Sequence, residues 1–552
     1  MVLASVFLLE RTKYIFCFYI DLIVNCDILN DSCIESYYIF AVTHFFTLRL
    51  LFLGDINFKG IFMSKRGIFI VTMGLLLSNA MAGLDGTIIN TALPSIISDL
   101  HGIQYIGWII AAFLLGMAVA TPLWSKLGER IGNKKAYQIA TLLFVLGSIF
   151  QALSNDITFF VIARAVMGIG AGGMNALPFI IYADLYTNLR KRSEVIGYAT
   201  ASFSAASIIG PLLGGWIVDS FSWHWVFYIN IPIALFSILS IQIFFKEPVR
   251  IATGKKIDSL GAFLMISALV SLLTGIQMIG TGSPVLVVAL MLTGLLLLVV
   301  LLKVEKEAAD PIIPNRLFKN VPLVIDFLMF ALLWGAFIAL NIYIPMWAQG
   351  LLGLSALIGG VTQIPGAITN FIGSVIGARI QGQLGKYRMV TFGTLAFLIS
   401  FFCMVFAGVD IPFWFLLIVG AFEGLGLGLC FNILQISVQQ DAEKRDIPIA
   451  TSFAFLLRIL SQTFMSAIYG VVLNHALMKG VAESNGEISI AMLNKLSNSQ
   501  NMTELPAALL PEMRQIMYGG LHHIMLIALI LLIIAFIFNL GMQSKMKQRR
   551  TI

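Results

Sequence analysis

Residues 125–135 read SKLGERIGNKK and stand between two apolar segments, residues 105–125 and 137–154. A membrane helix needs about 20 apolar residues, and each neighbouring segment is close to that length. Gly128 and Gly132 permit a tight turn, because glycine adopts backbone conformations that other residues avoid. The stretch therefore predicts a charged turn that joins two membrane helices.

The composition of the whole chain excludes a soluble protein. Of 552 residues, 59% are hydrophobic and 11% are charged, whereas soluble domains average roughly 45–50% apolar and about 25% charged residues. The same figures exclude a disordered chain and a nucleic-acid-binding protein. The sequence thus predicts an all-α integral membrane protein with many spans. A net charge of +7 is then typical of cytoplasmic loops rich in Lys and Arg.

Fourteen apolar segments follow residue 63, and we expect each of them to be a membrane helix. Some are separated by only a few polar residues, which is typical of helices that return directly through the bilayer. The segments cover approximately residues 68–93, 105–125, 137–154, 157–181, 195–218, 226–245, 260–280, 284–302, 321–346, 355–378, 389–408, 412–437, 449–474 and 520–541.

The charges between these segments test the count independently. With Met63 on the cytoplasmic side, 26 Lys and Arg residues fall on inward loops and tails, and three fall on outward loops. A missed or an extra span would invert every later loop and remove this asymmetry. We therefore expect 14 spans with both termini in the cytoplasm.

The loops also suggest two six-helix bundles with a helix pair inserted between them. We expect an N-terminal bundle over residues 63–246 and a C-terminal bundle over residues 321–552. The inserted pair and its flanking cytoplasmic loops would occupy residues 247–320. The outward loop 475–519 is long and polar, and we expect a partly ordered cap there rather than a catalytic domain.

Residues 1–62 differ from the rest of the chain in composition and in the pattern of apolar residues. Their apolar runs are short and interrupted by charges, and three of the five Cys residues lie here. Residues 59–63, KGIFM, can be back-translated into a bacterial ribosome-binding sequence followed by a start codon. Our hypothesis is that residues 1–62 are an over-extended gene start; the alternative is a weakly ordered leader.

Three further stretches carry a recognisable pattern. Residues 84–94, in the first expected span, read LDGTIINTALP. Residues 197–214, in the fifth, carry Gly and Pro at regular spacing. Residues 223–232, which follow that span, read WHWVFYINIP.

These stretches resemble signatures of the major facilitator superfamily and of its fourteen-span drug:proton antiporter branch. Residues 125–135 are similar to G-x-L-x-D-R-x-G-R-K-x, with Glu129 as the acid and departures at Ser125 and Asn133. Residues 84–94 resemble L-D-x-T-(I/V)-(I/V)-N-x-A-L-P. The fifth span follows G-x8-G-x3-G-P-x2-G with one Gly replaced by Ala, and residues 223–232 resemble W-R-W-x-F-x-I-N-x-P with one Arg replaced by His.

The resemblance implies a fold and a function. The fold would be two six-helix bundles, here with two inserted helices, around a central cavity that opens to one side of the membrane at a time. The function would be proton-coupled export of hydrophobic or cationic compounds.

Four residues of the charged turn are candidates for gating. Glu129 and Arg130 could latch one bundle to the other through ion pairs that break when the bundles rock, while Gly128 and Gly132 shape the turn. The alternative is an ordinary inward loop whose positive charges only fix the orientation of the chain.

The fifth span contains residues suited to a packing hinge. Gly197, Gly210 and Gly214 lack side chains, so a neighbouring helix can approach closely. Pro211 removes a backbone donor and permits a bend. A closely packed, bendable seam is what a rocking interface between helices requires.

Five charged residues inside expected spans are the strongest functional candidates, since each costs several kcal/mol in lipid unless it faces a cavity or a partner. They are Asp85, Arg164, Asp326, Glu423 and Arg458. We expect them to carry proton coupling and substrate binding, and the resemblance implies that Arg164 lies on the proton path. The alternative for each is a static buried pair. Arg458 would then be the structural partner of Glu423, and Asp326 would lie at the membrane interface.

Several other classes of site are excluded or unsupported. Residues 168–173 fit the dinucleotide pattern G-x-G-x-x-G, but they lie inside an expected span and indicate helix packing instead. The chain has no G-x-x-x-x-G-K-[ST] motif, which argues against an ATP-driven pump. No His and Cys residues have metal-site spacing, and His522 and His523 are better explained as interfacial residues. We expect no metal, no cofactor and no enzymatic activity.

The resulting expectation is a monomeric proton-driven exporter in a bacterial plasma membrane, with no nucleic-acid partner. Its partners would be protons, the lipid bilayer and a lipophilic, often cationic small molecule. Aromatic residues such as Trp108, Phe113, Trp334, Phe337 and Tyr343 are candidates for the cavity wall. Two alternatives stay open: an exporter of a metabolite, lipid or peptide with the same fold, and a non-transporting membrane sensor or scaffold.

Overall fold

Helices form most of the chain that the computed structural model describes, which comprises residues 65–186, 188–247, 259–279, 282–307, 315–443, 446–499 and 501–551. These ranges contain no strand, so the predicted all-α fold is confirmed. The expectation for residues 1–62 falls outside the described residues.

The first half of the described chain forms one group of helices. It contains α3 (Lys65–Asp99), η1 (Ile103–Tyr105), α4 (Ile106–Ile131), α5 (Asn133–Ala152), α6 (Ile157–Leu185), α7 (Leu189–Ser220), α8 (Trp225–Tyr228) and α9 (Asn230–Phe244). An inserted pair follows, α10 (Ser259–Gln277) and α11 (Pro284–Glu307).

The second half begins with η2 (Asn315–Lys319) and, like the first half, consists mainly of long helices. It contains α12 (Val321–Met346), η3 (Trp347–Leu351), α13 (Ala356–Val361), α14 (Ile364–Leu384), α15 (Lys386–Val405), α16 (Phe413–Asp441), α17 (Ile447–Glu483), α18 (Ile490–Leu496), η4 (Asn501–Glu504) and α19 (Leu510–Thr551).

Each predicted segment falls on a helix, but two segments are broken. Residues 226–245 form α8 and α9, and residues 355–378 form α13 and α14. Pro232 and Pro365 lie in the first turns of α9 and α14. Proline has no N–H to donate to the preceding turn, so a new helix starts just before it.

The polar loop predicted at residues 475–519 is shorter and more helical than expected. α17 continues to Glu483, and α19 begins at Leu510, so the described residues between them form α18, η4 and short turns. Hydropathy marks only the membrane-length part of a helix, which is why the prediction ended α17 too early. The chain turns at Asn485 and Gly486, both with positive φ, a conformation typical of helix ends.

Ten helices are long and apolar enough to cross a membrane by length and composition, counted over the described ranges only. They include α3, α6, α12 and α19. Two further apolar stretches, Ala205–Ser220 and Phe263–Gln277, belong to the longer helices α7 and α10.

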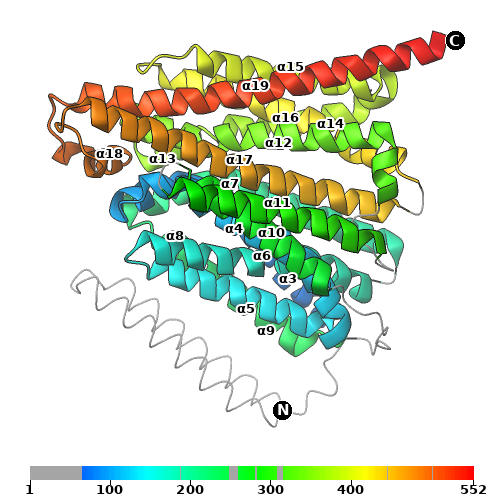
Figure 1. The fold of residues 1–552 in the computed structure, drawn as a ribbon. Coiled ribbons are helices and arrows are strands. Elements are labelled where there is room, and N and C mark those ends of the chain that lie inside the picture. The colour runs from blue at the N-terminus through cyan, green and yellow to red at the C-terminus, as the bar shows by residue number, and fades with distance from the viewer. Residues whose placement is uncertain are drawn as a thin grey trace, which may run out of the picture. The chain divides into compact units, whose positions relative to one another are not determined.

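The two halves lie side by side and repeat one packing scheme. In Figure 1, α3–α9 form the lower group, while α12, α14–α16 and α19 form the upper group. α4 packs on α6 in the first half as α14 packs on α16 in the second. The turns before α5 and α15 also match, since Gly132 and Gly385 have φ values of 95° and 76°.

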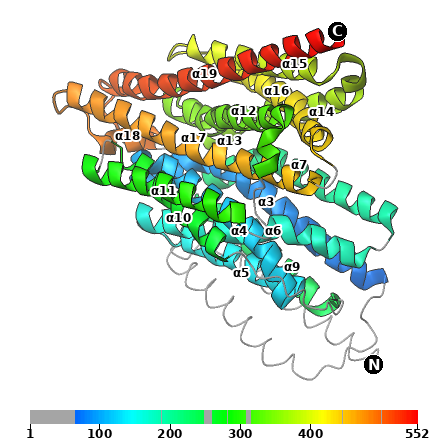
Figure 2. The ribbon, with the colours of Figure 1, turned by 45° about the vertical axis from the view of Figure 1, so that its right-hand side comes forward.

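The inserted pair lies at the junction of the halves. α10 packs on α4 and α17, and α11 packs on α10, as both views show (Figures 1 and 2). Val285, Leu292 and Leu296 of α11 are 78%, 62% and 63% exposed. An apolar face this exposed is suited to lipid contact.

Glycines bring the paired helices into backbone contact. A Cβ on Gly168 of α6 would overlap the carbonyl of Phe113 in α4. In the second half, a Cβ on Gly424 of α16 would overlap the carbonyl of Gly366 in α14. Such close approach replaces the hydrophobic driving force that helices lack when they are surrounded by lipid.

This packing predicts that Gly424→Ala destabilises the protein. The added methyl group has no room against α14, and overpacking of this kind typically costs about 1–3 kcal/mol. The apparent midpoint of thermal unfolding in detergent should fall.

Gly519→Ala in α19 is the matched control, because a Cβ there meets nothing within 4 Å. Its midpoint should stay or rise slightly, since Ala favours a helix over Gly by about 1 kcal/mol. Equal midpoints for the two variants would contradict the role given to Gly424.

Candidate functional site

Asp85 and Arg164 form an ion pair inside the first half. Arg164 Nη1 of α6 lies 3.2 Å from Asp85 Oδ2 of α3, and both side chains are almost fully buried. The sequence prediction that both are functional left their spatial relation open, and the structure brings them together. Removing one partner of a buried pair strands the other charge, at a cost of about 3–5 kcal/mol.

An aromatic ring contacts this ion pair, and two of its polar atoms have no hydrogen-bond partner among the described residues. The guanidinium carbon of Arg164 lies 4.3 Å from the centre of the Phe113 ring, a cation–π distance. Asp85 Oδ1 and Arg164 Nε make no hydrogen bond to a described residue. The pair therefore has one acceptor atom and one donor atom that are unpaired among the described residues.

Packing explains how α6 presents Arg164. Asp156 starts the helix by accepting hydrogen bonds from the N–H groups of Thr158 and Phe159. Gly168, one turn after Arg164, lets α4 approach until Phe113 covers the guanidinium group.

Glu423 of α16 is buried and has no ion-pair partner among the described residues. Its exposed fraction is 6%, and Oε1 makes no hydrogen bond. Glycines lie close to it: Gly420 and Gly424 contact α14, where a Cβ on Gly366 would stand 3.4 Å from Glu423 Oε2. An isolated carboxyl group in such a place is costly when ionised.

Arg458 of α17 does not pair with Glu423, so the interpretation of the two as a static pair is wrong. Its guanidinium carbon lies 4.7 Å, 5.3 Å and 5.8 Å from the ring centres of Phe455, Phe431 and Trp334. The second half thus holds a carboxyl group and a guanidinium group that are both buried or half-buried and separate, unlike the paired charges of the first half.

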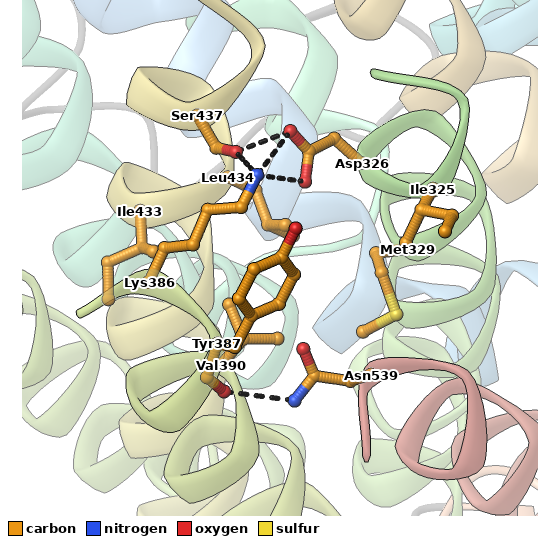
Figure 3. A pocket seen from close by; sticks show the side chains of 10 residues that line it. All are labelled: Ile325, Asp326, Met329, Lys386, Tyr387, Val390, Ile433, Leu434, Ser437 and Asn539. Carbon is orange, nitrogen blue, oxygen red and sulfur yellow. Dashed lines mark hydrogen bonds and ion pairs between the residues drawn. The ribbon is translucent and has the colours of Figure 1, made fainter. Parts of the chain in front are cut away.

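Asp326 lies in a third cluster, shown in Figure 3. Lys386 Nζ at the start of α15 lies 3.4 Å from Asp326 Oδ2 and also pairs with Asp441 at the end of α16. The hydroxyl of Ser437 donates to Asp326. Asp326 therefore has a partner at the end of the bundle, which favours a structural ion cluster over a lone proton carrier.

The sequence analysis missed Lys386 and Asp441. Charges in inward loops and at span ends are common, and only the fold shows that Lys386 contacts both Asp326 and Asp441. The available signal was Gly385 followed by Lys386, which matches Gly132 followed by Asn133 in the first half.

The predicted gating turn connects α4 and α5, and Gly132 occupies its positive-φ position with φ 95°. Glu247 after α9 accepts hydrogen bonds from the N–H groups of Asn133 and Lys134 at 2.5 and 3.3 Å. Burial lowers the pKa of Lys134, and the charge of Glu247 partly opposes that shift. The turn is therefore fixed to α9 by a residue that the sequence analysis missed.

Of the two charged gating candidates, the structure describes the side chain of Arg130 but not that of Glu129. Arg130 is exposed at the end of α4 and makes no ion pair with a described residue. The side chain of Glu129 lies outside the described set. Gly128 packs tightly, since a Cβ there would stand 3.1 Å from Leu177 and would overlap Asn133.

The predicted hinge residues of the fifth span form a seam on α7 against α3. Cβ atoms on Gly210 and Gly214 would collide with Thr87 and Thr91 of α3. Gly197 differs, because a Cβ there meets nothing within 4 Å. Close packing therefore requires Gly210 and Gly214, but not Gly197.

The opposite side of α7 contacts the second half. A Cβ on Gly215 would stand 2.6 Å from the carbonyl oxygen of Ala356 in α13, and one on Gly360 would overlap the carbonyl of Pro211. Asp219 accepts hydrogen bonds from the N–H groups of Ala356 and Leu357 at 3.2 and 2.8 Å. Helix α7 thus packs closely on both halves.

More hydrogen bonds join the halves at the same end, the end of the molecule that carries α18. Asn90 Nδ2 donates to Asn341 Oδ1 at 2.7 Å, and Gln349 donates to the carbonyl of Thr91 at 3.1 Å. Asn90 and Thr91 belong to the stretch 84–94 singled out in the sequence.

The chain around α18 adds two contacts to this set. Asn494 accepts from the N–H of Ile103 at 2.8 Å, and Asn501 donates to Ser98 at 2.9 Å. We call the cross-half hydrogen bonds of Asn90, Gln349, Asp219, Asn494 and Asn501 the α18-end seal.

Groups of three or more His, Cys, Asp or Glu suited to a metal ion are absent from the described residues. His522 and His523 each contact a backbone carbonyl, those of Val405 and Gly519. Of the expected cavity aromatics, Phe113 and Trp334 face the guanidinium groups of Arg164 and Arg458.

Comparisons with known proteins identify relatives among efflux transporters. The chain is 30% identical over 478 residues to multidrug resistance protein 3 of Bacillus subtilis, covering 84% of this chain and 93% of the relative. It is 29% identical over 511 residues to the multidrug transporter protein MdtP of the same organism, covering 86% and 93%. The rubrofusarin-specific efflux pump aurT of Gibberella zeae is 26% identical, covering 79% of this chain and 83% of the relative.

The fold is also similar to solved transporter structures. The crystal structure of a bacterial homologue of the human lysosomal transporter Spinster has a TM-score of 0.62 and 14% identity, covering 86% of this chain and 97% of that chain. The family model for the Major Facilitator Superfamily matches residues 75–466, which is more than half of the chain. The chain therefore belongs to the Major Facilitator Superfamily, a family of membrane transporters and not of enzymes.

Proposed function

We propose that the protein is a drug:proton antiporter that exports lipophilic, often cationic compounds across a bacterial plasma membrane. The observation that carries the proposal is the presence of two buried carboxyl groups in unlike surroundings. Asp85 is paired with Arg164 in one half, and Glu423 stands without an ion-pair partner in the other. The names of the multidrug relatives support the substrate class.

The two carboxyl groups suit different steps. Glu423 in its protonated form needs no counter-ion, and in its ionised form it would attract a cation. Asp85 can exchange its Arg164 partner for a proton, which would release the guanidinium group. A proton and a cationic substrate can therefore compete for the same negative charges, which is the requirement for antiport.

The arrangement of the halves supports alternating access. We propose that all fourteen segments cross the membrane, with both termini in the cytoplasm. The α18-end seal then lies on the outer side, so the structure corresponds to a state closed to the outside. Rocking about the α7 seam would break this seal and open the outer side.

The charged turn is proposed as the latch of the opposite end. Arg130 is exposed and without an ion-pair partner among the described residues, while Glu247 keeps the turn attached to α9. In the outward-open state the turn would contact the second half, and Arg130 and Glu129 would then form ion pairs across the halves.

One relative supports a narrower alternative. The pump from Gibberella zeae is named for a single compound, so a metabolite exporter with the same fold is the second candidate. Proteoliposomes with an imposed proton gradient test the main proposal: addition of a lipophilic cation should dissipate the gradient, and protein-free liposomes should not respond.

For proton coupling, we expect Asp85→Asn to abolish proton-driven efflux while the protein still reaches the membrane. Asparagine keeps the volume of the side chain but cannot ionise. Glu423→Gln should abolish efflux too, or restrict it to neutral compounds. Substrate-induced proton release and drug efflux are measured together with the membrane content of each variant.

The control is Asp410→Asn, which removes an exposed carboxylate from the loop before α16 and should leave efflux unchanged. Normal coupled efflux by Asp85→Asn would remove Asp85 from the mechanism. Normal efflux by both Asp85→Asn and Glu423→Gln would overturn proton coupling through these groups.

For the gate, Arg130→Ala should slow efflux at least several-fold with little change in the thermal midpoint, because exposed ion pairs contribute about 0–1 kcal/mol to stability. Lys191→Ala, another exposed cytoplasmic charge in the proposed topology, serves as the control. The latch role is wrong if Arg130→Ala transports at the parental rate.

For topology, we expect a cysteine introduced at Lys191 in a cysteine-free background to react with an impermeant thiol reagent only from the cytoplasmic side. A cysteine at Glu487, between α17 and α18, should react only from outside. Both residues are exposed, so access to the reagent depends on the side of the membrane. Labelling of the two positions from the same side would overturn the proposed arrangement.

A further inference from the structure

A cavity of about 180 Å³ lies where the inserted pair meets both halves. Its walls come from η1, the start of α4, the end of α10 and the middle of α17. Tyr105, Trp108, Met278 and Val471 give it an aromatic and apolar surface. The lining residues include no charged side chain, which separates this cavity from the charges assigned to transport.

Two amide groups in the cavity wall lack hydrogen-bond partners. Gln277 Nε2, a donor, and Asn474 Oδ1, an acceptor, make no hydrogen bond in the described structure. Both residues are 7% exposed. Buried polar atoms are almost always paired, so an unpaired donor and an unpaired acceptor on two residues that line one cavity favour a polar guest.

The local packing of the chain keeps this space accessible to Gln277. α4 and α17 cross at Gly107 and Gly470, where a Cβ on Gly470 would stand 2.7 Å from the Cα of Gly107. A Cβ on Gly107 would stand 2.5 Å from Gln277 Nε2. The two glycines thus leave room for an amide that comes from the inserted pair.

Size and chemistry restrict the guest. A dry cavity of roughly 150 Å³ accommodates benzene, so about 180 Å³ suits one aromatic ring with a small substituent. A hydroxyl group on the ring would accept a hydrogen bond from Gln277 and donate one to Asn474. The absence of charged lining residues favours a neutral molecule, because nothing in the wall would compensate an ion.

We propose that this cavity is a second binding site, for a neutral single-ring phenol. α10 supplies part of its wall. The site lies apart from Asp85, Arg164 and Glu423 and does not depend on proton coupling. Water alone would satisfy the amides but would gain nothing from Tyr105 and Trp108.

The probe is 4-fluorophenol. Its binding to the purified full-length protein in lipid nanodiscs is measured by ¹⁹F NMR line broadening. Saturable broadening is expected beyond that of empty nanodiscs. The matched probe 4-fluorotoluene, which lacks the hydroxyl group, should bind about tenfold more weakly, because it leaves both amides unpaired.

Two variants test the residues directly. Gln277→Leu and Asn474→Leu should each weaken 4-fluorophenol binding about tenfold, with little effect on 4-fluorotoluene. Gln440→Leu removes an exposed amide from α16 and should bind both probes like the parent. Thermal midpoints confirm that each variant is folded, and the comparison of the two probes on the parent protein holds even if a variant does not fold.

Equal binding of the two probes, or broadening no greater than that of empty nanodiscs, would overturn the proposal and leave a cavity that holds water only. Transport assays play no part in this test, so its failure would not bear on the antiporter proposal.

Discussion

Backbone-to-backbone contact through glycine is the constraint on which the rest of this structure depends. In lipid, no hydrophobic driving force brings helices together, so they must gain stability from close van der Waals packing. Gly168 and Gly424 provide that contact within the halves, and Gly215 and Gly360 provide it between them. The buried charges can be tolerated because these contacts fix the surrounding helices.

The halves share one packing scheme but differ in how they hold charge. In the first half, Asp85 and Arg164 compensate each other, and Phe113 covers the guanidinium group. In the second half, Glu423 and Arg458 remain apart, and Arg458 contacts aromatic rings instead. The two halves therefore combine similar helix packing with different surroundings for their buried charges.

The sequence predicted the helices well because hydropathy measures the physical requirement of a membrane span. It failed where helices continue past the membrane, as α17 does to Glu483, because hydropathy does not record helix continuity. The breaks at α9 and α14 carried a signal in Pro232 and Pro365 that was not used.

For the site, single residues could be predicted, but most partnerships could not. An intramembrane charge is visible in the sequence because of its energetic cost, and this made candidates of Asp85, Arg164 and Glu423, all three of which are buried. Lys386 and Glu247 were missed, because charges at span ends are common and gain significance only from their contacts. The separation of Glu423 from Arg458 likewise depends on helix rotation, which hydropathy does not determine.

The α18-end seal has a consequence for how the protein responds to its surroundings. Its hydrogen bonds join amides, hydroxyls and backbone groups, and the one carboxylate among them, Asp219, binds backbone N–H groups rather than a cation. Dissolved ions screen interactions between charges far more than short hydrogen bonds between dipoles. These contacts between the halves should therefore depend on temperature and on the packing of α7 and α13, and hardly at all on ionic strength.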